Sequence, residues 1–261
     1  MARDLKKYVT RRINETFDEY LESTEVKTEF GRPIIGFAST EHPLFDTFFS
    51  RGENDHPKNV FRPGYSAIVA YVPYYVGDTP EEARNSFFES IHLVMRINAV
   101  IKQCLTDVGR LYSGCSNLID WDKTHHRREW SDNLVAYLAG LGDFGPAGSF
   151  VLSKDVVPEG APYCEPGWAG RVGTILTDGF YADKAPEMSN EDLEAEFERI
   201  QTACRFLGAE EVQCSDEMIA ACPGGAISTE GIDRAACQDY CETINSRTPS
   251  PDVCAQCYRY R

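Results

Sequence analysis

The stretch Ser66-Ala-Ile-Val-Ala-Tyr-Val72 is an apolar run that ends at a proline. A second run of the same character is Pro33-Ile-Ile-Gly-Phe-Ala38. Short apolar runs bounded by proline or glycine are typical of buried strands, so we expect the two runs to pair in one sheet. Arg171-Val-Gly-Thr-Ile-Leu-Thr177 is a third strand candidate.

Helical patterns alternate with these strands. Apolar residues recur every four positions near the N-terminus, which predicts a helix over residues 4–20. Thr79-Pro-Glu-Glu82 combines a capping hydroxyl, an early proline and a glutamate three residues after the cap, so a helix starts there and reaches Val108 or beyond. Further elements are expected at residues 133–142 (helix), 149–152 (strand) and 190–206 (helix). This order predicts an α/β (α+β) core over residues 1–182 and a small Cys-rich module over residues 183–261.

The charge balance limits the class of partner. The 261 residues include 26 Lys and Arg against 41 Asp and Glu, a formal net charge of −15. Such a chain repels nucleic acid and anionic membranes at long range, so we expect neither as a partner. No apolar run is long enough to span a bilayer, and the N-terminal Met-Ala-Arg-Asp does not resemble a signal peptide. We therefore expect a cytoplasmic protein.

Cysteine is the most informative residue type in this chain. Of ten cysteines, seven fall within the last 58 residues. In a reducing compartment this crowding indicates metal ligation or redox chemistry before it indicates disulfides. The seven are Cys204, Cys214, Cys222, Cys237, Cys241, Cys254 and Cys257.

The sequence Cys222-Pro-Gly-Gly-Ala-Ile227 resembles the end of the ferredoxin run C-x2-C-x2-C-x3-C-P, whose last Cys ligates the second cluster of a pair. Counting back with that spacing reaches Met218, Ser215 and Val212, which do not bind iron well. The ligands of one cluster are thus missing, whereas those of the other remain. The resemblance implies one [4Fe-4S] cluster on four thiolates. They are Cys222, Cys237, Cys254 and Cys257.

Other interpretations of these cysteines stay open. Zinc also accepts four thiolates, although zinc sites usually pair two C-x2-C knuckles and this chain offers one. Two disulfides or structural thiols are further alternatives. Cys204, Cys214 and Cys241 do not fit the ferredoxin spacing; they are either buried thiols or the remains of a degenerate second site.

Ala139-Gly-Leu-Gly-Asp-Phe-Gly145 is the second unusual segment. Its glycines would let the backbone approach a bulky ligand closely. The segment also matches the dinucleotide-binding string G-x-G-x-x-G, but here the helical pattern precedes the glycines, whereas that motif opens a helix. A helix C-cap followed by a tight turn is the purely structural alternative.

Three motifs in order resemble the catalytic region of epoxyqueuosine reductases and corrinoid reductive dehalogenases, and most of all shorter iron–sulfur proteins related to the former. They are A-G-L-G-x-F-G, G-R-x-G-x-x-x-T-D and C-P-x-x-A-I, spread over residues 60–257. The resemblance implies a nitroreductase-like core that holds base-off cobalamin, beside a ferredoxin-like module that passes electrons to cobalt. The residues that it places around the corrin are Gly140, Leu141, Gly142, Phe144, Gly145, Arg171, Gly173, Thr174, Thr177 and Asp178.

The general acid of the resembling enzymes is an aspartate, and the equivalent position here is His126. Histidine can donate a proton near neutral pH, so His126 is the catalytic candidate. Alternatively, His125 and His126 form a cationic lip with neighbouring basic residues. Tyr137 and Tyr163 are other possible proton donors.

The sequence therefore predicts a cobalamin-dependent iron–sulfur oxidoreductase that reduces a small organic substrate. The alternative is a corrinoid carrier or corrinoid-reducing redox partner without chemistry on another substrate. Reduction of tRNA itself is disfavoured by the negative charge. An electron donor such as ferredoxin or flavodoxin would need a basic docking face, and such cores often form homodimers. A flavin in place of cobalamin stays open on the same core.

Overall fold

The computed structural model describes residues 2–23, 25–114, 121–122, 127–128, 130–145, 149–205, 216–229, 231–245, 254 and 257. Strands and helices are mixed along the chain. They are α1 (Ala2–Ser23), β1 (Ile34–Ser39), α2 (Pro43–Ser50), α3 (Pro57–Val60), β2 (Ser66–Tyr75), α4 (Pro80–Asp107), β3 (Tyr112–Gly114), β4 (Trp121–Asp122), β5 (Arg127–Arg128), α5 (Asp132–Leu138), β6 (Gly142–Gly145), β7 (Ser149–Leu152), β8 (Trp168–Thr177), α6 (Asn190–Arg205), α7 (Asp216–Ala221), β9 (Ile227–Ser228), β10 (Gly231–Ile232) and α8 (Arg234–Asn245).

The central sheet has the strand order β1-β2-β8-β3, and all of its pairs are antiparallel. Its three long members are the runs expected from the sequence, and β1 pairs with β2 as predicted. β8 is longer than expected because it begins at Trp168 and pairs with β2 along its whole length. The mixed α/β class is thereby confirmed.

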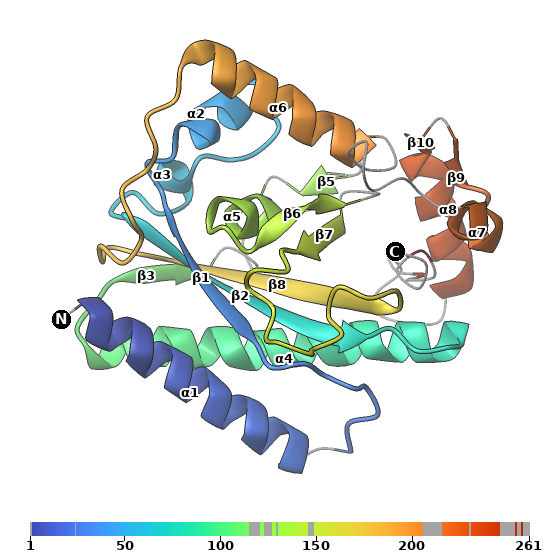
Figure 1. Ribbon diagram of the computed structural model, residues 1–261, viewed down its shortest axis with the longest axis horizontal. Helices are drawn as coiled ribbons and strands as arrows, with labels where there is room; N and C mark the ends of the chain where they lie inside the picture. Colours follow the sequence, from blue (N-terminus) through green and yellow to red (C-terminus); the bar gives the residue numbers. More distant parts are fainter. Residues whose placement is uncertain are drawn as a thin grey trace.

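Each face of the sheet is covered by a different layer (Figure 1). α1 and α4 cover one face, where the predicted stripe of α1 is buried against the sheet together with Ile68 and Ile175. α5 and the β6–β7 hairpin cover the opposite face, where Val69 and Leu176 belong to a second core. Since successive strand residues point to opposite faces, the two cores share the strands but not the side chains.

The N-terminus of α4 is fixed by the capping box expected from the sequence. The Thr79 hydroxyl accepts a hydrogen bond from the Glu82 backbone N–H at 3.2 Å, and the Glu82 carboxylate accepts one from the Thr79 backbone N–H at 2.9 Å. These bonds satisfy N–H groups that have no partner within the helix. The Asp78 N–H, the Thr79 hydroxyl and the Thr79 N–H all donate to the Glu82 carboxylate and hold its pKa below the usual value.

We expect Thr79→Ala to lower the free energy of unfolding by about 1 kcal/mol, because the cap acceptor is lost. Chemical denaturation followed by circular dichroism measures this change. Thr79→Ser is the matched control and should keep nearly all of the stability, since its hydroxyl occupies the same place. Equal losses in both variants would contradict a capping role.

α6, the helix expected at residues 190–206, packs on the core. Its side chains Phe197, Ile200 and Ala203 are buried in the same core as α2 and α5. The rings of Phe48 and Phe197 meet edge to face with centroids 4.8 Å apart. The Cys-rich elements that follow lie at the right of Figure 1. α6 thus packs on the core formed with α2 and α5, and the module boundary at residue 183 stays a prediction.

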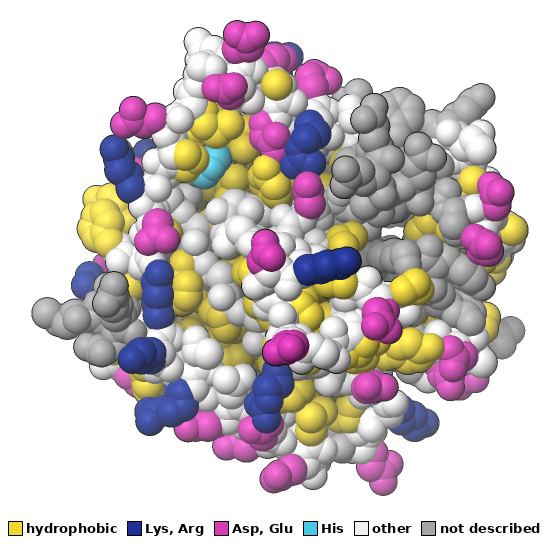
Figure 2. Space-filling view, in the orientation of Figure 1, with side chains coloured by type: hydrophobic (Ala, Val, Ile, Leu, Met, Phe, Trp, Pro, Cys, Tyr) yellow, Lys and Arg dark blue, Asp and Glu magenta, His cyan; other side chains and the backbone are white. Residues whose placement is uncertain are grey.

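Acidic and basic side chains are interspersed over the face shown in Figure 2, so the acidic excess forms no single patch there. Among the residues that the structure describes, no helix has the length and hydropathy needed to cross a membrane.

Candidate functional site: the Cys-rich module

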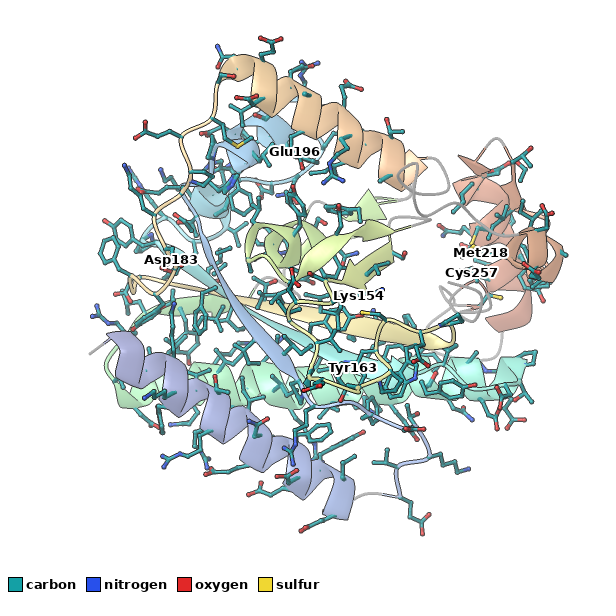
Figure 3. All side chains as sticks on the ribbon, viewed as in Figure 1. Lys154, Tyr163, Asp183, Glu196, Met218 and Cys257 are labelled. Carbon is teal, nitrogen blue, oxygen red and sulfur yellow. The ribbon has the colours of Figure 1, made fainter. Side chains whose placement is uncertain are left out.

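The Cys-rich module has a small core of its own. Met218 of α7 and Ile227 of β9 are buried, and Cys222 and Cys257 pack against them. Figure 3 shows Met218 and Cys257 close together in this part of the molecule. Two of the four predicted ligands thus contact one apolar cluster, although 35 positions separate them in the sequence.

The turn after α7 directs hydrogen bonds at Cys222. The Gly225 N–H donates to the Cys222 carbonyl at 3.1 Å, and Gly225 takes the positive φ of 60° that closes this turn. The next N–H, from Ala226, donates to Cys222 Sγ at 3.3 Å. N–H donors of this kind stabilise a negatively charged sulfur and tune the potentials of iron–sulfur clusters.

α8 contributes two cysteines that differ in burial. Cys237 is exposed, whereas Cys241, one turn later, is only 3% exposed. The interaction with the neighbouring Cys237 side chain, together with burial, raises the pKa of Cys241. The backbone N–H of Cys254 donates to Cys241. Cys241 therefore has two of the predicted ligands, Cys237 and Cys254, among its neighbours, which the ferredoxin spacing did not indicate.

The chemistry of these groups fits an iron–sulfur cluster, because thiols and N–H donors are what such a cluster requires. Their arrangement is not yet a ligand set. In the described part of the chain, no group of three or more His, Cys, Asp or Glu side chains is placed to hold a metal ion. Metal binding commonly assembles its own ligands, so this does not contradict the prediction. The assignment of Cys222, Cys237, Cys254 and Cys257 stays a prediction.

The other cysteines divide into two groups. Cys104 of α4 is buried in the core, and Cys164 donates to the Leu152 carbonyl at 3.4 Å. The Cys104 side chain thus contributes to core packing, and the Cys164 thiol to a hydrogen bond within the fold. The side chains of Cys115, Cys204 and Cys214 lie outside the described residues.

The glycine-rich segment

Gly140 ends α5 through a hydrogen-bonded cap. Its N–H donates to the Tyr137 carbonyl at 2.8 Å, and the Leu141 N–H donates to the Ala136 carbonyl at 3.1 Å. With the left-handed φ of 72° at Gly140, this is a Schellman motif. The helix expected to reach Gly142 therefore stops at Leu138, and the capping alternative accounts for the first glycine.

The other two glycines permit close pairing in the β6–β7 hairpin. A Cβ at Gly142 would lie 2.0 Å from the Val151 carbonyl oxygen, and one at Gly145 would lie 2.6 Å from Ser149 Oγ. Leu141 and Phe144 are buried in the core. The hairpin therefore explains why this segment is rich in glycine without a ligand.

The candidates on β8 are split between the two faces of the sheet. Arg171 lies with its guanidinium 3.9 Å from the centre of the Phe87 ring of α4, and a Cβ at Gly173 would meet Val94 of α4 at 2.6 Å. Thr174 alternates with these residues and points to the opposite face. One macrocycle does not contact both faces at once, so the described residues of the predicted set form no single cradle.

Polar atoms nevertheless remain unsatisfied on this strand. Thr174 Oγ1 and Arg171 Nε are buried without a hydrogen-bond partner in the described structure. By contrast, the Thr177 hydroxyl accepts from the Gly179 N–H, and the Asp178 carboxylate accepts from the Leu111 N–H. The corrin assignment stays a prediction, and Thr174 and Arg171 are its members with unused polar atoms.

A cluster beside the glycine segment

The catalytic candidate His126 and its neighbour His125 lie outside the described residues. Tyr163, an alternative proton donor, accepts a hydrogen bond from the Arg32 N–H through its hydroxyl and packs over Gly31. This contact indicates a structural position for Tyr163.

Tyr137, the other alternative donor, belongs to a polar cluster that sequence analysis missed. Its hydroxyl donates to the carboxylate of Glu196 on α6, and Figure 3 labels the position of Glu196. Arg199, one turn along α6, donates to Glu196 at 2.8 Å and to both oxygens of Asp143 at 2.8 and 3.0 Å. The i,i+3 spacing of Glu196 and Arg199 was visible in the sequence, but their partners on α5 and β6 were not.

The contacts within this cluster shift the pKa values of Tyr137 and Glu196 in opposite directions. Burial and the hydrogen bond to Glu196 raise the pKa of Tyr137 to about 12, so its hydroxyl stays protonated. Burial would raise the pKa of Glu196, but the hydrogen bonds from Arg199 and Tyr137 outweigh it and hold this pKa below its usual value. The cluster thus holds an ionised carboxylate that joins α6 to the core.

A carboxyl whose pKa is lower in the folded state adds stability above its unfolded pKa, about 4.3 for glutamate. We expect Glu196→Gln to lower the free energy of unfolding by about 1 kcal/mol at pH 7, a value discounted for partial exposure. The difference from the unsubstituted protein should shrink as the pH falls through the folded pKa of Glu196. Urea denaturation at several pH values measures it.

The matched control is Glu198→Gln on the same helix, where the side chain is exposed. Surface substitutions of this kind change stability by less than about 0.5 kcal/mol. A pH-independent loss in Glu196→Gln, or an equal loss in both variants, would contradict the role of the ionised carboxylate.

Comparison with known proteins

No family model and no curated protein matches this chain. Several solved structures of epoxyqueuosine reductases do match in fold. A selenomethionine-labelled enzyme gives a TM-score of 0.49 at 14% identity, covering 100% of this chain and 66% of that one. The Bacillus subtilis enzyme gives 0.45 at 14% identity, with coverages of 93% and 58%.

A third structure, an epoxyqueuosine reductase with an epoxyqueuosine-modified tRNA stem loop, gives a TM-score of 0.47 at 15% identity, with coverages of 93% and 58%. The chain thus spans about three fifths of the length of the structures that it matches. At TM-scores below 0.5, these likenesses support no argument about activity.

Proposed function

We propose that this chain is an iron–sulfur oxidoreductase with one [4Fe-4S] cluster in the Cys-rich module. The observation that carries the proposal is the N–H donor aimed at Cys222 Sγ from the turn that follows Cys222-Pro223. Cys222 is partly buried in a ferredoxin-like Cys-Pro turn, and an N–H donor at its sulfur would stabilise the negative charge that a cluster ligand bears. Packing of Cys257 near Cys222 further supports a shared site.

The experiment is anaerobic reconstitution of the full chain with iron and sulfide. We expect about four iron atoms per chain and a visible absorbance that bleaches on reduction. Zinc bound in place of iron, with no bleaching, would support the structural-zinc alternative and overturn the redox proposal. Absence of any bound metal would overturn both.

The electron acceptor in this proposal is a corrinoid, supported by the motif resemblance alone. Reduced cobalt is a strong nucleophile, and the protein would need to bind the corrin and exclude water. Because the described residues form no single cradle, we assign no reaction step to any of them. Titration of the iron-loaded protein with hydroxocobalamin tests whether the chain binds a corrinoid. An unchanged cobalamin absorbance would contradict corrinoid binding.

Two roles follow if the corrinoid binds. An enzyme would reduce a small organic substrate, whereas a carrier or redox partner would reduce the corrinoid and pass it on. Turnover of cob(II)alamin to cob(I)alamin without a further acceptor would favour the second role. Ferredoxin and flavodoxin are the donors to test, and size-exclusion chromatography tests the homodimer expected from the sequence.

A nucleic-acid partner also has to be tested. The net charge of −15 argues against one. However, one of the matching epoxyqueuosine reductases holds a tRNA stem loop, so the expected absence of such a partner is an open question. Binding of an RNA stem loop at moderate salt would favour RNA as the substrate class over a small molecule.

A further inference from the structure

The outward face of α1 carries charged side chains that the proposed function leaves without a role. The inner stripe of this helix is buried in the core, and the stripe opposite to it faces solvent. Lys7, Arg11, Asp18 and Glu22 follow the middle of the outward stripe, and all four are exposed. The helix lies at the periphery of the molecule (Figure 1). Its charged stripe is therefore accessible to a partner.

The charges of this stripe run against the dipole of the helix. Lys7 and Arg11 lie in the N-terminal half of α1, whereas Asp18 and Glu22 lie in the C-terminal half, and the last turn contains no basic residue. A helix dipole favours anions near the N-terminus and cations near the C-terminus. The order of the charges therefore does not serve the stability of the helix, which favours a contact outside the chain as its role.

Partners within the chain hold these charges only weakly. Arg11 Nε lies 3.7 Å from Glu15 Oε1, and Arg32 Nη2 lies 3.0 Å from Asp18 Oδ1. Both pairs are exposed to solvent, so they contribute little to stability. The other two charges of the stripe have no ion-pair partner in the part of the chain that the structure describes. All four charges can thus be used by a second molecule.

The stripe is complementary to itself when two copies meet antiparallel. Lys7 and Glu22 are equally far along the helix from its midpoint just after Asn14, and so are Arg11 and Asp18. A two-fold axis at that midpoint therefore places Lys7 of one copy opposite Glu22 of the other, and Arg11 opposite Asp18. A parallel arrangement would instead bring like charges together, which is unfavourable. The charge pattern thus specifies both the orientation and the register.

The spacing of the stripe also suits the side-by-side packing of two helices. Positions 7, 11, 14, 18 and 21 are separated alternately by four and three residues, which is the spacing of a two-helix seam. An open hollow of about 530 Å³ lies on this side of α1, lined by residues between Lys6 and Asp18. Leu21, which is 39% exposed, adds apolar surface at one end of the seam.

We propose that α1 is the contact surface of a homodimer, in which the outward stripes of two α1 helices meet antiparallel across a two-fold axis. Such an interface uses the same surface of both copies, so it closes at two chains. Exposed charge pairs hold weakly and are screened by salt, so the dimer forms at high protein concentration and low ionic strength. This inference names the surface of association and does not depend on the cluster.

The first test is sedimentation velocity of the full chain over a range of concentrations. We expect a reversible dimer whose dissociation constant rises at least about tenfold between about 0.05 M and about 0.5 M NaCl. A chain that stays monomeric at about 0.5 mM in low salt would overturn the proposal and leave the face to a different partner.

The second test reverses the charges of one half of the stripe at a time. Lys7→Glu with Arg11→Glu makes the stripe acidic, and Asp18→Lys with Glu22→Lys makes it basic. Each double variant should dimerise at least about tenfold more weakly than the unsubstituted chain, because like charges now meet. An equimolar mixture of the two should associate again, since an acidic stripe then meets a basic one. Undiminished dimerisation of either variant, or no association in the mixture, would overturn the proposal.

The matched control is Asp155→Lys with Glu159→Lys, at exposed positions outside α1. This variant has the same net charge as the one with the basic stripe, but its α1 is unchanged. It should dimerise as tightly as the unsubstituted chain. A comparable weakening would show that the overall charge controls association, and would overturn the role of the stripe.

Discussion

Replacing Cys254 by alanine is expected to reduce the iron of the reconstituted chain from about four atoms to less than about one. Cys254 is one of the four cysteines of the predicted ligand set, and it precedes another of them, Cys257, by three residues. A [4Fe-4S] cluster needs four thiolates, so a site left with three is incomplete. Iron analysis and the visible spectrum measure the loss directly.

Cys104→Ala is the matched control, because Cys104 is a buried thiol of α4 far from the module in sequence and fold. It should keep the full iron content even if it lowers stability slightly. Iron retained in Cys254→Ala and lost in Cys104→Ala would overturn the assignment of the cluster to the C-terminal cysteines.

Replacing Gly142 by alanine is expected to lower the free energy of unfolding by about 3 kcal/mol. The added Cβ would lie 2.0 Å from the Val151 carbonyl oxygen and 2.9 Å from the Leu152 Cα. Both atoms are backbone of the paired strand β7, so the conflict is not relieved by a side-chain rotation. Thermal and urea denaturation of the cluster-free chain measure the effect.

The matched control is Gly140→Ala in the same segment. A Cβ there meets nothing within 4 Å, and only the positive φ of 72° is strained, which costs about 1 kcal/mol. If Gly142→Ala instead kept its stability but weakened hydroxocobalamin binding, the glycine would serve a ligand and not the hairpin. The comparison thus separates the two explanations of this glycine-rich segment.

Local signals predicted most of the elements. The four-residue repeat of α1, the capping box before α4 and the apolar runs of β1, β2 and β8 each act within a few residues, and all of them appear where expected. The boundary of α5 was placed too late, because Gly140 and Gly142 look alike in sequence. Only the first forms the helix cap, and the second pairs with β7.

Contacts between distant segments account for what was missed. Tyr137, Asp143 and Arg199 come from three elements, and they meet because α6 packs its apolar face on the core. Similarly, the candidate residues of β8 follow one another closely in the sequence. In the strand, however, alternate residues point to opposite faces of the sheet.

Periodicity, caps and cysteine spacing were enough to assign the α/β class and to direct attention to the C-terminal thiols, since these patterns depend on neighbours along the chain. The burial of Cys241 beside an exposed Cys237, and the docking of α8 on the Cys222 turn, follow from packing between segments. Such packing depends on the shapes of all the surfaces that meet, which no single stretch of residues encodes.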